Sequence, residues 1–127
     1  MSDLQVQVVT PESLKYEGQA RRVQLPGVMG AMGILPQHAP LVTMLEPGIV
    51  EVIAAGGNKI FAVAQGFATI ANNQVVCLVD AAVDSSEIDS AKVAEKVAEL
   101  ESSLATHEDA GKRSELAYLR AQQHVKG

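Results

Sequence analysis

Asp84-Ser85-Ser86-Glu87-Ile88-Asp89 is the stretch at which the pattern of the chain changes. Before it, short apolar runs are broken by Gly, Pro and Asn; after it there is no Pro, and Ala becomes frequent. Asp84 with Glu87, or Ser86 with Asp89, has the spacing of a helix N-cap and the third helical residue, so we expect a helix to begin here. The sequence therefore predicts a strand region, residues 1–84, and a helical region, residues 85–127.

The region before this stretch predicts an all-β sandwich or barrel. Turn signals such as Thr10-Pro11, Pro47-Gly48 and Asn72-Asn73 recur at short intervals. Many short strands separated by such turns are typical of closed or layered β folds. The expected strands start at the alternating Leu4, Val6 and Val8 and at Val23 and Leu25, and continue over 41–45, 49–53, 59–65, 67–71 and 75–79.

The region after the stretch predicts two short helices joined by a turn. Val93, Val97, Leu100 and Leu104 recur at helical spacing and form one apolar stripe. Residues 106–111 interrupt the stripe, and a second helix is expected over 112–125. Neither helix would be stable alone in water, so each must dock on the other, on the strand region or on a partner.

Composition excludes several classes of function. A length of 127 residues suits one domain with a small appendage, not a large enzyme. The net charge of −5 argues against a nucleic-acid binder, which needs a basic face. Cys77 lies in an apolar run and is expected to be a buried thiol without a redox role. No run approaches the roughly 18 apolar residues of a membrane span, so we expect no direct membrane insertion and a partner for any work at a membrane.

Charge divides unevenly between the two expected helices. Residues 85–111 hold seven acidic and two basic residues, whereas 112–127 hold four basic residues and one acidic residue. Two explanations stay open: the helices complement each other in a hairpin, or the second helix binds an acidic partner elsewhere. The basic residues concerned include Lys112, Arg113 and Arg120.

Three local features point only weakly to chemistry. The glycines of Gly27-Val28-Met29-Gly30-Ala31-Met32-Gly33 lack the Lys-Ser/Thr pair of a phosphate loop, so we interpret them as tight turns beside a soft apolar patch of Met29 and Met32. His38 has no local nucleophile or orienting carboxylate, which makes a hydrolase the least favoured reading. His107 and His124 have no companions at metal-ligand spacing, so no metal site is expected.

Residues 30–41, Gly-Ala-Met-Gly-Ile-Leu-Pro-Gln-His-Ala-Pro-Leu, closely resemble the G-x-x-G-I-L-P-x-H-A-P-L segment of the epsilon subunits of bacterial-type F-type ATP synthases. Further similar segments follow in order along the chain: Val9-Thr10-Pro11-Glu12, Glu46-Pro47-Gly48, Gly66-Phe67-Ala68 and Ile88-Asp89. Their co-occurrence at this length makes the resemblance specific.

The resemblance implies a ten-stranded β-sandwich over 1–84, which sits on the c-subunit rotor ring and clasps the gamma subunit, and a helical hairpin over 85–127. The hairpin would lie folded on the sandwich or extend along gamma toward the alpha and beta subunits and restrain ATP hydrolysis, with Lys112, Arg113 and Arg120 as its contacts. The subunit itself would perform no chemistry. It also implies a rotor-ring interface over the loop from Gly30 to His38, made by Met29, Gly30, Ala31, Met32, Gly33 and His38. The expected location is the cytoplasmic face of a bacterial inner or plasma membrane.

Two departures from the family pattern bear on binding. Ala31 stands where many relatives carry Glu, so apolar contact through Met29 and Met32 would carry more of the ring interface. Some family members bind ATP through I/L-D-x-x-R-A on the first helix; Ile88 and Asp89 match, but Lys92 and Val93 replace Arg and Ala. Because Lys lacks the planar fork of Arg, we expect ATP binding to be weak or absent and no other cofactor.

The alternative function is a free-standing β-sandwich module that binds a protein, or a small ligand in a pocket closed by the hairpin.

Overall fold

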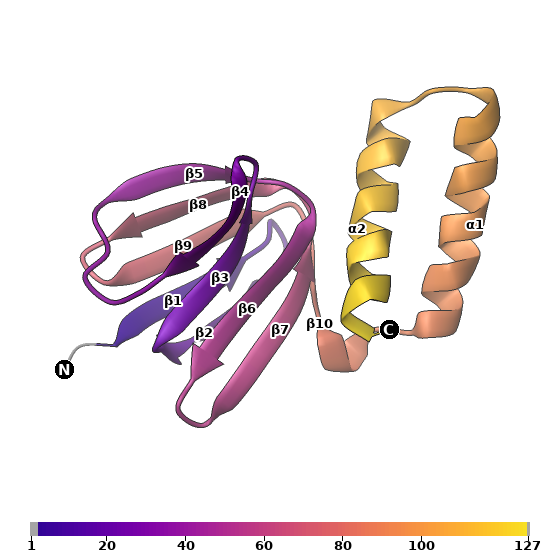
Figure 1. The fold of residues 1–127 in the computed structure, drawn as a ribbon. Helices are drawn as coiled ribbons and strands as arrows, with labels where there is room; N and C mark the ends of the chain where they lie inside the picture. The colour runs from indigo at the N-terminus through magenta and orange to yellow at the C-terminus, as the bar shows by residue number, and fades with distance from the viewer. Residues whose placement is uncertain (1–2, 127) are drawn as a thin grey trace.

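The computed structural model describes residues 3–126 as ten strands followed by a short 3₁₀ turn and two helices (Figure 1). The strands are β1 (Leu4–Val9), β2 (Leu14–Ala20), β3 (Arg22–Gly27), β4 (Gly30–Ile34), β5 (Leu41–Leu45), β6 (Gly48–Ala54), β7 (Gly57–Val63), β8 (Gly66–Ala71), β9 (Gln74–Val79) and β10 (Ala82–Asp84). After them come η1 (Ser85–Glu87), α1 (Ser90–Thr106) and α2 (Ala110–Lys126). The expected fold class, a β-sandwich followed by a two-helix hairpin, is confirmed.

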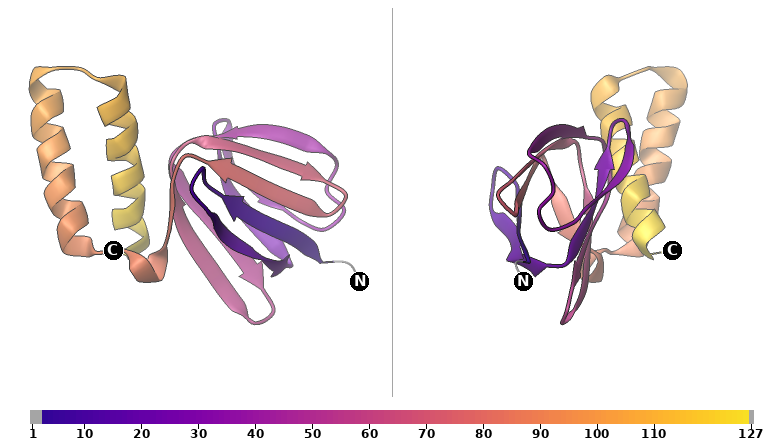
Figure 2. Two further views of the ribbon diagram at one scale, coloured as in Figure 1. Left: turned by 180° about the vertical axis from the view of Figure 1, so that it is seen from behind. Right: turned by 60° about the vertical axis from the view of Figure 1, so that its left-hand side comes forward.

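The strands form two layers that are joined at a corner (Figure 2). One layer runs β10-β7-β6-β3 with β4 beside β3, and the other runs β5-β8-β9-β1-β2. The layers meet where Gly27 of β3 pairs with Leu45 of β5. Neighbouring strands are antiparallel except for β1 and β9, which are parallel. The sandwich is therefore almost a closed barrel.

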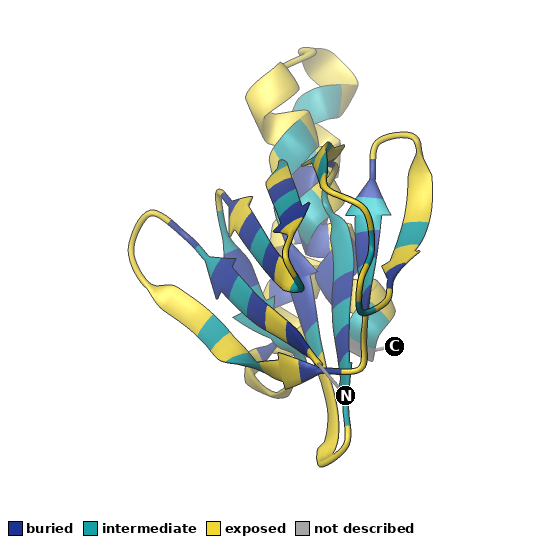
Figure 3. Ribbon diagram, turned by 90° about the vertical axis from the view of Figure 1, so that its left-hand side faces the viewer, coloured by how far each residue is buried: buried dark blue, intermediate teal, exposed yellow. Residues whose placement is uncertain are grey.

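Aliphatic side chains fill the space between the layers. Buried and exposed residues alternate along much of the sandwich (Figure 3), because successive side chains of a strand point to opposite faces. Phe61 is the one large aromatic of this core, and its ring meets that of Tyr16 edge-on at 5.9 Å between centroids. As expected from its apolar run, Cys77 is buried, and burial raises the pKa of its thiol to about 12.

Three strands, β2, β4 and β10, were not predicted from the apolar pattern of the sequence. β2 is mostly exposed and β10 is short, so neither gives a clear alternation. β4 contains Gly30 and Gly33, and we interpreted the glycines of this stretch as turn residues; this was wrong for Gly33, which pairs with Gln24 inside the β3–β4 ladder. Gly30 does lie at the turn, and its φ of 125° favours glycine.

Both helices begin at other residues than the sequence indicated. Asp84 caps η1, and α1 starts only at Ser90, with the Asp89 carboxylate accepting from the backbone N–H groups of Ala91 and Lys92. Asp89 is thus the N-cap itself and not the third residue of the helix. The second helix starts two residues before the predicted Lys112, because the Asp109 carboxylate accepts from the N–H of Lys112 and ends the loop at Ala110.

The hairpin forms an outer layer in which α2 lies between the sandwich and α1 (Figure 1). Its own small core consists of buried residues from both helices and the junction: Ile88, Val93, Val97, Leu116 and Leu119. The opposite side of α2 faces β6 and β7. Of the hosts that the sequence left open, the helices thus dock on each other, and α2 docks also on the strand region.

Candidate interaction surfaces

Large apolar side chains lie exposed on the outer face of β5, β8 and β9. Met44 pairs with Phe67, and Phe67 pairs with Leu78, so the three form a row across the strands. Val42 lies on the same face of β5 and is 70% exposed. The row continues around the edge, because the N–H of Val28 donates to the carbonyl of Met44 at 3.1 Å. We call this set the exposed apolar surface: Val28, Met29, Val42, Met44, Phe67 and Leu78.

A groove of about 340 Å³ lies between Val28, at the turn after β3, and the row on β5 and β8. Val28, Met44 and Phe67 line it, and Glu46 and Asp80 add carboxylates. Contiguous apolar surface with a polar rim marks a site where another molecule binds. The chemistry of the groove favours a partner that combines apolar and basic side chains.

The opposite layer of the sandwich is covered by the hairpin. Ile49 pairs with Ala62 and Ala62 with Val83, which puts one apolar row on the outer face of β6, β7 and β10. Ala62 is fully buried although it faces outward, since α2 lies over β7. Beside this contact a cavity of about 420 Å³ stays open between α2 and the sandwich, lined by apolar residues together with Gln24, Arg120 and His124.

The residues expected at the rotor ring are divided between the two ends of the sandwich. Gly30 to Ile34 form a strand and not part of a single loop, which corrects the expectation of one loop from Gly30 to His38. Met29 stands at the turn before this strand and is 97% exposed. His38 follows the strand at the far end, where the N–H of Gln37 donates to the Asn73 side chain at 2.5 Å.

Met29 and Met32 also do not form one patch. Met32 is half-buried and packs against the sandwich core, whereas Met29 points to solvent. Ala31 and Gly33, which stand on either side of Met32 along β4, are exposed. The structure thus brings together Met29, Gly30 and Ala31 at one end and separates them from His38.

The surroundings of His38 offer little for catalysis. Its Nδ1 lies 2.7 Å from the backbone carbonyl oxygen of Ala39, so this nitrogen carries the proton and donates. A carbonyl neither activates a nucleophile nor stabilises an imidazolium as a carboxylate does.

The residues of the altered nucleotide motif, where we expected ATP binding to be weak or absent, have structural roles in the hairpin. Ile88 is buried in the hairpin core, and Asp89 uses its carboxylate to cap α1. Lys92, whose N–H the cap satisfies, is exposed. Ile88 and Asp89 therefore have a structural role in the hairpin that does not involve ATP.

The basic residues of α2 contact the hairpin itself. Lys112 Nζ donates to Ser103 Oγ at 2.7 Å, and Arg120 donates to Glu101 of α1 at 2.7 Å. Arg113 binds Glu108 through two hydrogen bonds of 2.6 Å, which raises the pKa of Arg113 and lowers that of Glu108. In this folded arrangement the basic residues complement the acidic helix and its loop.

A second polar cluster lies where the sandwich joins the hairpin. The Asp84 carboxylate accepts from the N–H and the hydroxyl of Ser86 at 3.0 Å each, and from Lys59 Nζ at 3.2 Å. The backbone hydrogen bond from Ser86 and, after it, the contact with Lys59 hold the pKa of Asp84 below its ordinary value. Asp84 thus ties the first turn of the junction to β7.

Sequence reasoning missed the exposed apolar surface. The signal was present in residues 41–45, where apolar residues occupy both faces of one strand: Leu41 and Leu45 point inward, while Val42 and Met44 point outward. A strand of a sandwich that is apolar on both faces has something to bind on its outer face.

Comparison with known proteins identifies the family. Residues 3–85 match the family model of the ATP synthase delta/epsilon chain β-sandwich domain. The chain is 36% identical to an ATP synthase epsilon chain of Rhodopseudomonas palustris over 83% of this chain and 78% of the relative. It is 42% identical to ATP synthase epsilon chain 2 of Ralstonia nicotianae over 94% of this chain and 83% of the relative.

The fold agrees with a solved structure as well. A chain of the Euglena gracilis mitochondrial ATP synthase, in a structure of OSCP, F1 and the c-ring, superposes with a TM-score of 0.84 at 22% identity, over 100% of this chain and 83% of that one. Within residues 3–126, neither helix is both long and apolar enough to cross a membrane. The match of the family model and the identity to the curated relatives together show that the chain belongs to the family of ATP synthase epsilon chains.

Proposed function

We propose that the chain is a non-catalytic central-stalk subunit of a rotary proton-translocating ATP synthase. In this role it couples the catalytic head of alpha and beta subunits to the c-subunit rotor ring, and its C-terminal helices restrain ATP hydrolysis. Residues 1–84 bind gamma and the ring, and residues 85–127 are the regulatory arm. The subunit lies on the cytoplasmic side of the membrane and is held there through the complex.

The exposed apolar surface carries this proposal. Val42, Met44, Phe67 and Leu78 lie on the one outer face of the sandwich that the hairpin leaves uncovered. A permanent partner would remove these side chains from water, at a gain of about 25 cal/mol per Å² of apolar area. We assign this face to gamma, because a rotor subunit needs a contact that does not open during turnover.

A charge at the centre of the surface tests the assignment. Met44→Glu should weaken binding of the full chain to the gamma subunit of the same organism at least about tenfold, because an unpaired carboxylate would be buried. Ala94→Glu is the matched control, since it adds the same charge to the exposed face of α1. Equal affinity of both variants, measured by titration calorimetry, would remove gamma from this face.

For the ring contact we choose the Met29 end of the sandwich over the His38 end. The polar loops of a ring can meet only one end, and Met29 at 97% exposure offers apolar contact where Ala31 offers no carboxylate. Met29→Glu should then weaken assembly with the ring, and His38→Glu should not. The reverse order of effects would assign the ring to the other end.

The hairpin arm acts by leaving the sandwich. Its folded form covers Ile49, Ala62 and Val83, and its extended form would carry the basic residues of α2 toward acidic side chains of the catalytic head. Because Asp89 and Ile88 already serve the hairpin itself, we expect ATP to bind weakly if at all.

The cavity between α2 and the sandwich favours one alternative. Its volume of about 420 Å³ falls in the range of small-ligand sites, as a free-standing module with a hairpin lid would need. Co-purification separates the two functions. A stable complex with gamma supports the stalk subunit, whereas a monomer that ignores gamma and retains a small molecule supports the module.

A further inference from the structure

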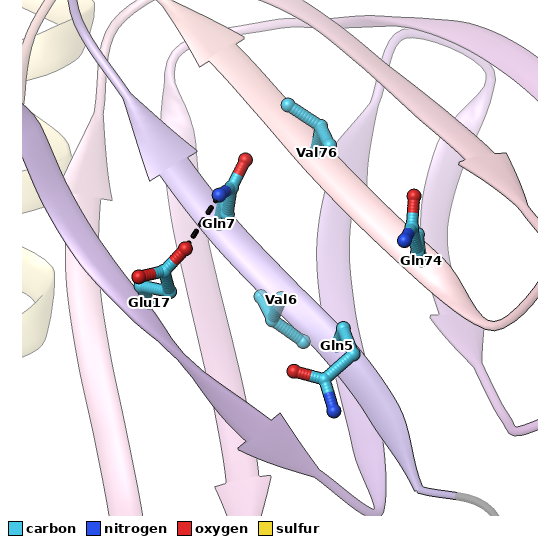
Figure 4. A pocket seen from close by; sticks show the side chains of 6 residues that line it. All are labelled: Gln5, Val6, Gln7, Glu17, Gln74 and Val76. Atoms are coloured by element: carbon cyan, nitrogen blue, oxygen red, sulfur yellow. Dashed lines mark hydrogen bonds between the residues drawn. The ribbon is translucent and has the colours of Figure 1, made fainter.

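A small polar pocket lies on the outer face of β1, β2 and β9 (Figure 4). Its volume is about 190 Å³. Strand register brings its residues together, since Gln7 pairs with both Glu17 and Val76, and Gln5 pairs with Gln74. The lining consists of three glutamines, two valines and one glutamate: Gln5, Gln7, Gln74, Val6, Val76 and Glu17.

Glu17 is the single ionisable residue in this lining. Its Oε2 accepts a hydrogen bond from Nε2 of Gln7 at 2.7 Å, which binds one carboxylate oxygen without neutralising its charge. The salt bridges found in the described part of the chain join Lys59 to Asp84, Arg113 to Glu108 and Arg120 to Glu101, and none involves Glu17. The pocket therefore combines one negative charge that no salt bridge compensates with three glutamine side chains.

The pocket continues the exposed apolar surface along the same sheet. Val42, Thr69, Val76 and Gln7 are successive partners across β5, β8, β9 and β1, and Glu17 follows on β2. A stable interface uses about 20 to 30 residues on each side, many more than the four exposed apolar residues assigned to gamma, Val42, Met44, Phe67 and Leu78. A partner that covers Val42 and Met44 must therefore extend across neighbouring strands. From β5 the sheet continues through β8 to Val76 on β9, and from there to this pocket on β1 and β2.

We propose that the pocket receives an arginine side chain of the gamma subunit. This inference rests on the proposed function, because it names a contact of the same partner on the same face. A guanidinium offers five donors in a planar fork, which suits a carboxylate that keeps one oxygen free of the Gln7 hydrogen bond, whereas an ammonium is a compact point charge. The apolar row supplies affinity, and the arginine fixes the register of the partner on the sheet.

Removal of the charge without change of shape tests the pocket. Glu17→Gln keeps an oxygen for the hydrogen bond from Gln7, so thermal unfolding of the full chain should not change. Its affinity for gamma should fall about tenfold at low salt, as a charge-assisted bidentate contact is lost, and the difference from wild type should shrink at high salt. Glu12→Gln is the control, because it removes the same charge from an exposed turn between β1 and β2.

The outcomes distinguish a failure of the arginine contact from a failure of the proposed central-stalk function. If the wild-type chain does not bind gamma, the proposed function fails and the inference with it. If Met44→Glu weakens binding while Glu17→Gln behaves like Glu12→Gln at every salt concentration, the pocket is not a contact and the proposed function stands. A carbodiimide joins carboxylates to primary amines, which guanidinium lacks. A Glu17-dependent cross-link to a gamma lysine would therefore overturn the assignment to arginine.

Discussion

The sandwich and the hairpin differ in how completely each encloses its own core. Eighteen buried residues fill the sandwich, and several of them, such as Leu4, Val23 and Ile34, are 0% exposed. The hairpin core has five buried residues, each still 5 to 7% exposed. The sandwich therefore has the packing of an independent domain, while the hairpin depends on a surface to which it can dock.

The contact between the two regions is also loosely packed. Small side chains, Ala117 and Ala121, face the sandwich from α2, and a cavity of about 420 Å³ stays beside them. Only the short junction 85–89 connects the hairpin covalently to β10. Because this contact is small and leaves a cavity open, separation of the hairpin from the sandwich should cost little free energy. A hairpin that leaves the sandwich reversibly would need this property.

The largest expected effect comes from the sandwich core. Phe61→Ala should lower the free energy of unfolding by about 3 to 5 kcal/mol, because it removes a buried ring and its edge-on contact with Tyr16. Guanidinium denaturation followed by circular dichroism measures this change. The hairpin signal should be lost in the same transition, since the helices lose the surface on which they dock. A loss below about 1 kcal/mol would mean that the core tolerates the cavity.

A matched change in the hairpin should act locally. Leu119→Ala removes about 2 to 5 kcal/mol of packing from a region with little stability of its own, so the helices should melt while the sandwich stays folded. A chain that ends at Asp84 supplies the reference signal for a folded sandwich without helices. One shared transition at a lower midpoint, with helical and strand signals lost together, would instead make the hairpin an integral part of the domain.

The sequence is informative where burial follows a simple period. The alternation of Leu4, Val6 and Val8 and the helical stripe of Val93 and Val97 both predicted the faces that the structure buries. Strands β2 and β4 could not be found in this way, because an edge strand such as β2 buries little and β4 contains two glycines. The alternation of apolar residues in a sequence predicts a strand only where one face of that strand is buried. In an edge strand or beside a glycine, burial depends on the neighbouring strands, which the local sequence does not show.

The candidate surfaces were harder to predict than the fold. Residues adjacent in sequence, Met29 to His38, were expected at one site, but an intervening strand carries them to opposite ends of the sandwich. Conversely, the exposed apolar surface and the Glu17 pocket unite residues far apart in sequence through cross-strand register. Such sites depend on strand order, and a single sequence does not give strand order directly.

An intermediate effect is expected from the charges of α2. Reversing Lys112, Arg113 and Arg120 to Glu should relieve inhibition of ATP hydrolysis several-fold, if the extended arm meets acidic side chains in the head. Each exposed pair contributes only about 0.2 to 1 kcal/mol and is screened by salt, so three changes are needed. ATPase activity of the reconstituted head at low and high salt measures the effect, and gamma binding should not change.

The folded hairpin supplies the control for this experiment. Glu101→Gln removes the partner of Arg120 on α1 but leaves every basic residue of the arm in place. If the charges act in the head, this variant should inhibit at least as well as the wild type. Unchanged or deeper inhibition by the triple variant at low salt would restrict the basic residues to a role inside the hairpin.

The smallest effect is expected at the junction between the two regions. Asp84→Asn keeps an oxygen for the N–H of Ser86 but loses the charge that attracts Lys59, so it should weaken the junction by about 1 kcal/mol near neutral pH. Folding lowers the pKa of Asp84 from its ordinary 3.8, so the ionised carboxylate stabilises the folded junction above that value. This stabilisation is lost as the pH falls below 3.8 through the lower folded pKa, and asparagine does not titrate. Amide exchange of the junction should therefore differ between the two chains at neutral pH and converge in acid, with Asp80→Asn as an exposed control on the preceding turn. A difference that persists or grows in acid would show that Asp84 does not secure the hairpin through its charge.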